Sequence, residues 1–154
     1  MRSLESQWGH ITSLIKNNEI DAVVELCRKM KKEEYDIITG RLIEELQSKE
    51  DKRYRNTIAI VLSDLKCDDA VETLVELIKD PKNRNCRGTF LYALENLRCG
   101  TVIKELIPIL TDGNLEVRWI MCELISENIE SMNESDRLEC MRILREEKRK
   151  LWRE

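Results

Sequence analysis

The sequence predicts an all-α fold, an α-solenoid of about nine helices arranged as antiparallel pairs, and three observations support it. Apolar residues recur at spacings of three and four along most of the chain, which is typical of amphipathic helices. The 154 residues include only 5 glycines and 2 prolines, too few for a fold of short strands and turns. A sequence repeat with a period of 31 to 32 residues is typical of stacked helix pairs.

Helix positions follow from the apolar spacing and from residues that start and stop helices. We expect helices at 3–16, 20–32, 34–48, 52–66, 69–80, 85–98, 101–111, 115–130 and 134–151. Pro81 and Gly100 stand where the fifth and sixth helices end. Thr101 and Ser135 are side chains suited to cap the seventh and ninth helices. Gly40 lies inside the third helix, where we expect a close contact with another helix, because glycine destabilises a helix interior by about 1 kcal/mol.

The repeat is visible when the sequence is compared with itself at this offset. Three segments align, RNTIAIVLSDLKC, RGTFLYALENLRC and RWIMCELISENI, and they begin at Arg55, Arg87 and Arg118. A shift of 32 residues also pairs Cys67 with Cys99. The offset becomes 31 beyond residue 112, as expected if one loop is a residue shorter. We therefore expect the helix pairs to be equivalent units of one solenoid.

Two segments carry a resemblance to a known family. In IKDPKNRNCRGTFLYALENL (78–97) and ILTDGNLEVRWIMCELI (109–125), an apolar helix ending in Asp precedes a short loop, an Arg and a helix of small and apolar residues. This pattern resembles short HEAT-like repeats. The resemblance implies a single HEAT-like domain over 1–154, with irregular N-terminal helices in 1–51, regular repeats in 52–130 and a capping helix in 131–154. It also implies binding to other proteins, since such solenoids only occasionally act as enzymes.

Residues that recur in step with the repeat are expected to serve the fold. Cys67 and Cys99 occupy one repeat position, and we expect both in the core. In HEAT-like proteins the recurring Arg resembles a structural residue that pairs with the preceding loop or helix end, and a ligand clamp is the alternative. The arginines and the aspartates near them are Arg55, Arg87 and Arg118 with Asp51, Asp80 and Asp112.

Composition and charge argue against several classes of function. The formal net charge of −4 and the pI of about 5.3 argue against general affinity for nucleic acid. No apolar run approaches the roughly 18 residues that span a bilayer, and no basic, apolar leader begins the sequence. Without a secretory signal, the 6 cysteines are expected to be reduced thiols in a cytoplasmic protein, and they form no Cys-x-x-Cys motif that would favour a zinc site.

Neither catalysis nor a cofactor is expected. His10 is the only histidine, so the sequence lacks the repeated His-Glu pairs with which some HEAT-like enzymes bind iron, and a zinc site is not expected either. The five glycines are isolated from one another and form no Gly-rich phosphate loop. Nothing in the sequence singles out an acid and base couple among the many carboxylates. We therefore predict no catalytic, cofactor-binding or metal-binding residue.

Charge alternates with the predicted helices. The stretches 33–51, 64–80 and 101–116 contain the second helix of each pair and carry net charges of −5, −4 and −2, whereas 52–63 and 81–100 each carry +3. In HEAT-like solenoids the second helices line the concave face, so the resemblance implies an acidic inner face. Residues between the apolar stripes are expected to face solvent or a partner, among them Thr73 and the carboxylates Glu44, Glu72, Glu76 and Glu105.

Trp119 is a candidate anchor for a partner. Its repeat equivalents are Asn56 and Gly88, so the core does not require a large ring at this position. Tryptophan is also enriched in interface hot spots. Packing of Trp119 on a neighbouring loop is the alternative.

The first and last helices are expected to close the solenoid. Trp8 and Trp152 lie in these helices, where aromatic rings commonly seal the open core. The last helix is otherwise rich in charge, and we expect it to pack on the solenoid through residues such as Leu138, Met141 and Leu151 while presenting one polar face to solvent.

These observations predict a non-enzymatic protein-binding module that docks a basic protein on its acidic face. Its most concrete form is a bacterial immunity protein, an antitoxin that neutralises a toxin domain such as a nuclease by covering the cations that hold phosphates. The alternatives are an acidic face that serves only solubility, a general scaffold or adaptor, and an enzyme subunit of the bilin-lyase type, whose repeats look similar.

Overall fold

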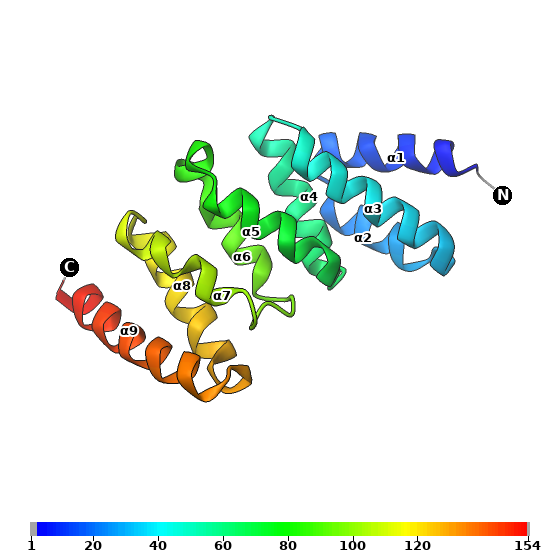
Figure 1. Cartoon of the computed structure of the whole chain (residues 1–154). Helices are drawn as coiled ribbons and strands as arrows, with labels where there is room; N and C mark the ends of the chain where they lie inside the picture. Colours follow the sequence, from blue (N-terminus) through cyan, green and yellow to red (C-terminus); the bar gives the residue numbers. More distant parts are fainter. Residues whose placement is uncertain (1–2, 154) are drawn as a thin grey trace.

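The computed structural model describes residues 3–153, and within them the chain forms nine α-helices and no β-strand. Figure 1 shows the helices stacked in sequence order, with α1 at one end and α9 at the other. The helices are α1 (Leu4–Lys16), α2 (Ile20–Arg28), α3 (Lys32–Ser48), α4 (Lys52–Asp64), α5 (Val71–Lys79), α6 (Arg87–Leu94), α7 (Ile103–Leu106), α8 (Leu115–Asn128) and α9 (Glu134–Arg153). The predicted all-α solenoid is confirmed.

Within the described residues, four short 3-10 helices extend or join these elements. They are η1 (Asp68–Ala70), η2 (Pro81–Cys86), η3 (Ile107–Thr111) and η4 (Ile129–Ser131). The seventh helix, predicted over 101–111, therefore divides into the single turn of α7 and the 3-10 segment η3. Pro108 explains this division, because proline has no N–H to donate and its ring hinders continuation of an α-helix. Thr101 does not cap this helix, since the N-cap position belongs to Val102.

Side-chain caps set the start of several helices. The Asp51 carboxylate accepts a hydrogen bond from the Tyr54 amide at 3.0 Å and opens α4. Asn114 accepts one from the Val117 amide at 2.9 Å and opens α8. At the last helix the prediction of Ser135 is wrong: Ser135 lies inside α9, and the side chain of Asn133 caps the first turn by accepting from the Asp136 amide at 2.8 Å.

The helices form two layers. The helices α2, α4, α6 and α8 pack side by side in one layer, and α3, α5 and α7 pack side by side in the other. Each antiparallel pair, such as α3–α4 or α5–α6, connects the layers, and α9 packs along α8. In Figure 1 the layer of α3, α5 and α7 lies in front of that of α4, α6 and α8. The layered stack gives the molecule two broad faces and two ends.

The core lies between the two layers. Phe90 on α6 is the largest of its fully buried side chains, and it packs among leucines such as Leu62 and Leu94. Cys67 and Cys99 are buried, as their shared repeat position predicts. The Ser63 hydroxyl donates a hydrogen bond of 2.7 Å to the carbonyl of Ala93, which joins α4 directly to α6.

The recurring arginines are structural and link one helix pair to the next. Arg55 is buried and donates to the Asn83 side chain at 3.2 Å. Arg87 is also buried; it donates to the Ile78 carbonyl at 2.7 Å and pairs with Asp112 at 3.1 Å. In both cases the partner side chain lies 28 or 25 residues further along the chain, in the following repeat.

Arg118 continues this pattern with a different partner. It pairs with Glu147 of α9 at 3.1 Å, 29 residues further on. The expected contact with the preceding helix end holds for Arg87, which donates to the Ile78 carbonyl, whereas its ion-pair partner Asp112 lies in the following loop. Asp51 and Asp80 instead cap the segments that follow them, because a carboxylate at the start of a helix accepts backbone N–H groups that have no helical partner.

Two local expectations are wrong. Gly40 is exposed, and a Cβ placed on it would meet nothing within 4 Å, so no helix contact explains the glycine. Thr73, expected to face outward, is buried, because α5 is covered on both sides by α3 and α7. A close approach occurs instead at Gly113, where a Cβ would lie 2.8 Å from the Ile109 carbonyl oxygen.

The two ends of the stack differ from each other, and the α9 end also differs from the prediction. Trp8 is half-buried and packs against the core, as expected of an aromatic residue that closes the first helices. Trp152 does not seal the other end, because 84% of its surface is exposed. Leu138 and Met141 also lie on the outer side of α9, whereas Leu151 is buried as predicted.

Candidate functional site

An acidic groove lies on the face of the molecule formed by α5 and α7. It has a volume of about 680 Å³, and it is lined by Glu72, Val75, Glu76, Lys79, Asp80, Pro81, Val102 and Glu105. The α5 side chains of Glu72 and Glu76 are one helical turn apart and therefore share a face. Glu105 reaches the same groove from α7. Three of the four glutamates predicted to meet a partner are thus brought together.

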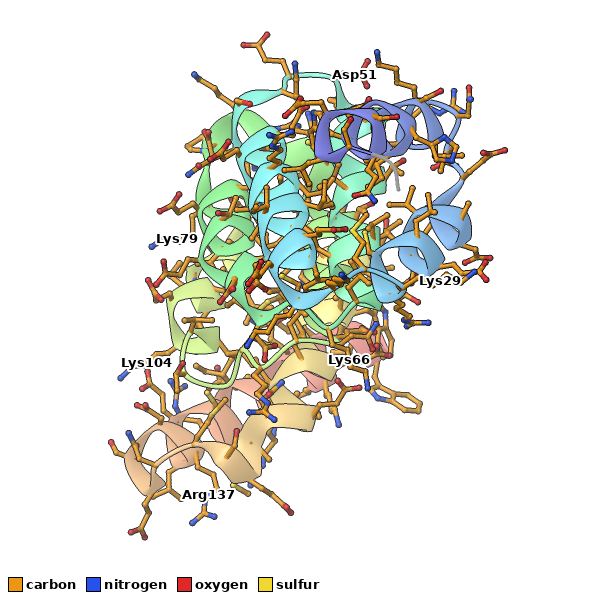
Figure 2. The ribbon with its side chains drawn as sticks, turned by 90° about the vertical axis from the view of Figure 1, so that its right-hand side faces the viewer. Lys29, Asp51, Lys66, Lys79, Lys104 and Arg137 are labelled. Atoms are coloured by element: carbon orange, nitrogen blue, oxygen red, sulfur yellow. The ribbon has the colours of Figure 1, made fainter. Side chains whose placement is uncertain are left out.

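The groove keeps a net negative charge. Its lining includes four carboxylates and a single ammonium group. That ammonium, on Lys79, pairs with Glu105 across the groove at 3.5 Å, and both side chains are about half exposed. An exposed pair of this kind contributes only about 0–1 kcal/mol to stability, so a partner can displace it at little cost. Figure 2 shows Lys79 and Lys104 on the same side of the molecule, with Lys29 toward the opposite side.

Apolar side chains form a floor in the groove beside its carboxylates. Val75 is buried, Val102 is half-buried, and Pro81 is exposed at the start of η2. A guanidinium or ammonium group that binds the carboxylates can therefore lay its aliphatic stem on these residues. The arrangement suits long basic side chains better than it suits a small metal ion.

The acidic surface extends toward α3. The Gln47 amide donates to Glu76 at 3.4 Å and links α3 to α5. Glu44 lies three residues before Gln47 and is exposed. The hydrogen bond with Glu5 raises the pKa of Arg41, and the charge of Glu44 adds to this effect. Glu44 does not line the groove itself, but it extends the negative charge along the same layer.

The structure does not bring Trp119 to this groove. Trp119 lies on α8, in the other layer, with 46% of its surface exposed. Its repeat equivalent Gly88 shows which way this position points, because a Cβ on Gly88 would lie 3.3 Å from the Glu116 carboxylate of the next helix in the layer. Trp119 therefore points along the stack, away from α6 and toward the end formed by α8 and α9.

Burial holds several of the thiols in their neutral form. Burial raises the pKa of Cys27 and of Cys99 to about 11, and it also raises the pKa of Cys67. A thiol in this state is a poor nucleophile near neutral pH. His10 is exposed beside a shallow hollow between α1 and α2. Within residues 3–153, no three His, Cys, Asp or Glu side chains are gathered closely enough to hold a metal ion.

A sequence match over the repeats that contain the acidic groove identifies the family. A family model described as HEAT repeats matches residues 39–123, which run from α3 into α8 and include every residue of the acidic groove. The chain belongs to the HEAT-repeat family. HEAT repeats mediate protein interactions, so the chain is a protein-interaction scaffold of this family. No curated protein and no solved structure matches the chain. No helix within residues 3–153 is long and apolar enough to cross a membrane.

Sequence reasoning missed the apolar part of this HEAT-repeat groove. Val75 and Val102 belong to apolar stripes that also supply the core, so periodicity alone assigns them inward. The shift of 32 residues could have revealed the junction, because it pairs Val71 of α5 with Ile103 of α7 and thereby sets the two helices side by side.

Proposed function

We propose that this HEAT-repeat chain is a non-enzymatic immunity protein that binds and neutralises a basic toxin domain, such as a nuclease, in the cytoplasm of a bacterium. The observation that carries the proposal is the convergence of Glu72, Glu76 and Glu105 on one groove that also has an apolar floor. Such a groove offers both the negative potential that steers a basic partner and the apolar surface that retains it.

Neutralisation by this groove requires no chemistry. A nuclease holds phosphate groups with lysine and arginine side chains. When those side chains enter the groove, their charges pair with the carboxylates and the nucleic acid loses its binding surface. The two binding events exclude each other, so the immunity protein inhibits by occupying the site.

The experiment is capture of partners from a lysate of the source organism on the immobilised protein, with mass spectrometry and elution by increasing salt. We expect one stoichiometric basic partner that elutes only at high salt, because interactions between exposed charges weaken as the Debye length shortens. The double variant Glu72→Lys/Glu76→Lys should lose this partner. A retained partner would place the interface elsewhere on the molecule.

A matched control separates the groove from total charge. Glu123→Lys/Glu127→Lys changes the net charge by the same amount on α8, in the other layer, where both side chains are exposed. This control variant should still capture the partner. The captured domain must also show toxin or nuclease activity that the protein abolishes at equimolar ratio.

The same experiment distinguishes the other candidate functions. Several partners of micromolar affinity would favour a general adaptor, because a neutraliser must bind tightly. Purified protein that carries a chromophore would contradict the non-enzymatic proposal and favour an enzyme subunit.

A further inference from the structure

Exposed apolar side chains are concentrated at one end of the molecule. Within the described residues, five of the seven large apolar side chains that are exposed belong to α8 and α9. They are Leu115, Trp119, Leu138, Met141 and Trp152. The other end is different, because the exposed side of α1 carries polar residues such as Glu5, Ser6 and His10. The end helices of a solenoid need a polar outer face for solubility, and α9 departs from this rule.

The outer face of α9 carries Leu138 and Met141 near its start and Trp152 near its end, with arginines between them. Leu138, Met141, Arg145 and Trp152 follow each other at helical spacings of three, four and seven residues, so they share a face. The residues that pack inward, Cys140, Glu147 and Leu151, lie on the opposite side of the helix. The stripe from Leu138 to Trp152 is about 21 Å long, at about 1.5 Å per residue. This length fits a helix laid alongside α9.

The stripe is bordered by positive charge. Arg142, Arg145 and Arg149 lie along it at spacings of three and four residues, and all three are exposed. Arg142 forms an exposed ion pair with Glu146 at 3.0 Å, whereas Arg145 and Arg149 form no ion pair with any residue from 3 to 153. The buried carboxylate of this helix, Glu147, faces inward and is already bound by Arg118 and Lys150. The outer face is therefore basic as well as apolar.

Trp119 lies at the same end of the stack. Its repeat position is the one through which α6 meets α8, so on α8 it points to the place where a further helix of that layer would pack. The side chains of the end surface, defined as Trp119, Leu138, Met141 and Trp152 with Arg142, Arg145 and Arg149, thus come from both helices of the last pair.

We propose that this end surface docks an acidic amphipathic helix of a partner protein. Charge selects the occupant: a helix with leucine-type residues on one side and carboxylates beside them matches the apolar stripe and the three arginines. A second copy of this chain fits poorly. Two α9 helices in a symmetric pair would set the arginines of one copy against those of the other, and α1 and α2 present no exposed large apolar residue to a head-to-tail contact.

The test uses two synthetic peptides of about 15 residues, which as helices match the stripe in length. Both carry leucine at helical spacing with alanine between, and they differ only in having glutamate or lysine at the remaining positions. Calorimetric titration of the 154-residue protein should give binding of the glutamate peptide at least about tenfold tighter than that of the lysine peptide. Equal affinity for the two peptides, or no binding of either, overturns the proposal.

Variants tie the binding to this surface. Trp152→Ser should weaken binding of the glutamate peptide about tenfold. It should not affect folding, because the ring is almost fully exposed. Arg142→Glu/Arg145→Glu/Arg149→Glu should reverse the preference toward the lysine peptide. The control Lys32→Glu/Lys52→Glu/Arg53→Glu makes the same change in net charge at exposed residues of α3 and α4, and it should keep the wild-type preference.

Two further measurements address the other occupants. Sedimentation that shows a dimer abolished by Trp152→Ser would make a second copy the occupant and overturn the proposal. Binding to vesicles of phosphatidylcholine and phosphatidylserine that competes with the glutamate peptide would overturn it in favour of a lipid surface. Glu72→Lys/Glu76→Lys should leave peptide affinity unchanged, so this result is independent of the groove between α5 and α7.

Discussion

The acidic groove and the end surface differ in sign, in position and in how they are built. The groove lies in the middle of the stack, where two neighbouring helices of one layer contribute glutamates at similar places. The end surface lies on the last helix pair and carries exposed arginines around large apolar side chains. The charged residues of both surfaces occupy positions that the repeat leaves free of core packing. In this solenoid the repeated residues build the helical core, which we call the frame. The residues that depart from the repeat distinguish one surface from another.

The largest expected effect tests the frame that both surfaces share. Phe90→Ala should lower the free energy of unfolding by about 3–5 kcal/mol, because it leaves a cavity where the largest buried side chain packs. Urea denaturation measures this change. Tyr92→Ala on the same helix removes an exposed ring and should cost less than about 0.5 kcal/mol. Similar costs for the two variants would contradict the assignment of Phe90 to the core.

A smaller effect is expected at the arginine beside the groove. Arg87→Ala should destabilise the protein by about 2–3 kcal/mol, since it leaves the buried Ile78 carbonyl without its donor and breaks the pair with Asp112. The comparison is with Lys79→Ala, which removes only an exposed pair and should cost less than about 1 kcal/mol. Both values come from chemical denaturation. A loss at Lys79 as large as that at Arg87 would mean that the groove is part of the frame.

Alkaline pH should destabilise the fold through its buried thiols. In the unfolded chain the thiols of Cys27 and Cys99 have their ordinary pKa of 9.0, whereas in the native protein burial raises the pKa of each to about 11. Between these values the unfolded state binds fewer protons than the native state, so stability falls as pH rises and is fully retained below pH 9. Cys27→Ala/Cys99→Ala should flatten the pH dependence measured by denaturation, and an unchanged slope would contradict burial of these thiols.

The smallest effect distinguishes an interface from a core. Leu138→Ser and Trp152→Ser should each change the free energy of unfolding by less than about 0.5 kcal/mol, because both side chains are mostly exposed. Thermal denaturation of the two variants checks this. A loss comparable to that of a buried leucine would show that another part of the chain covers α9, and the end surface would then be unavailable to a partner.

Periodicity predicted the fold well because helices that recur at a fixed interval bury their apolar stripes by stacking successive pairs side by side. The shared positions of Cys67 and Cys99, and of the three arginines, already indicated structural roles. The partners of the arginines were harder to predict. A guanidinium group reaches several ångströms from its helix, so its partner is chosen by the packing of the following repeat and not by distance along the sequence.

The last helix shows where pattern reasoning fails. Its apolar residues are few and do not define a single face, so Leu138 and Met141 were expected to pack inward. The inner face instead includes Glu147, whose burial depends on its pair with Arg118 of α8. A buried carboxylate cannot be told from a solvated one in a helix with this many charges. The groove was easier, because the glutamates that line it lie on regular repeats.

The forward reach of Arg55, Arg87 and Arg118 has a consequence for how the molecule unfolds. Each guanidinium group ties a helix pair to the pair that follows it, over sequence separations of 25 to 29 residues. In a linear array, strong nearest-neighbour coupling raises the cost of a boundary between folded and unfolded units. The whole chain should therefore melt in a single cooperative transition, without frayed intermediates in which one end of the array remains intact.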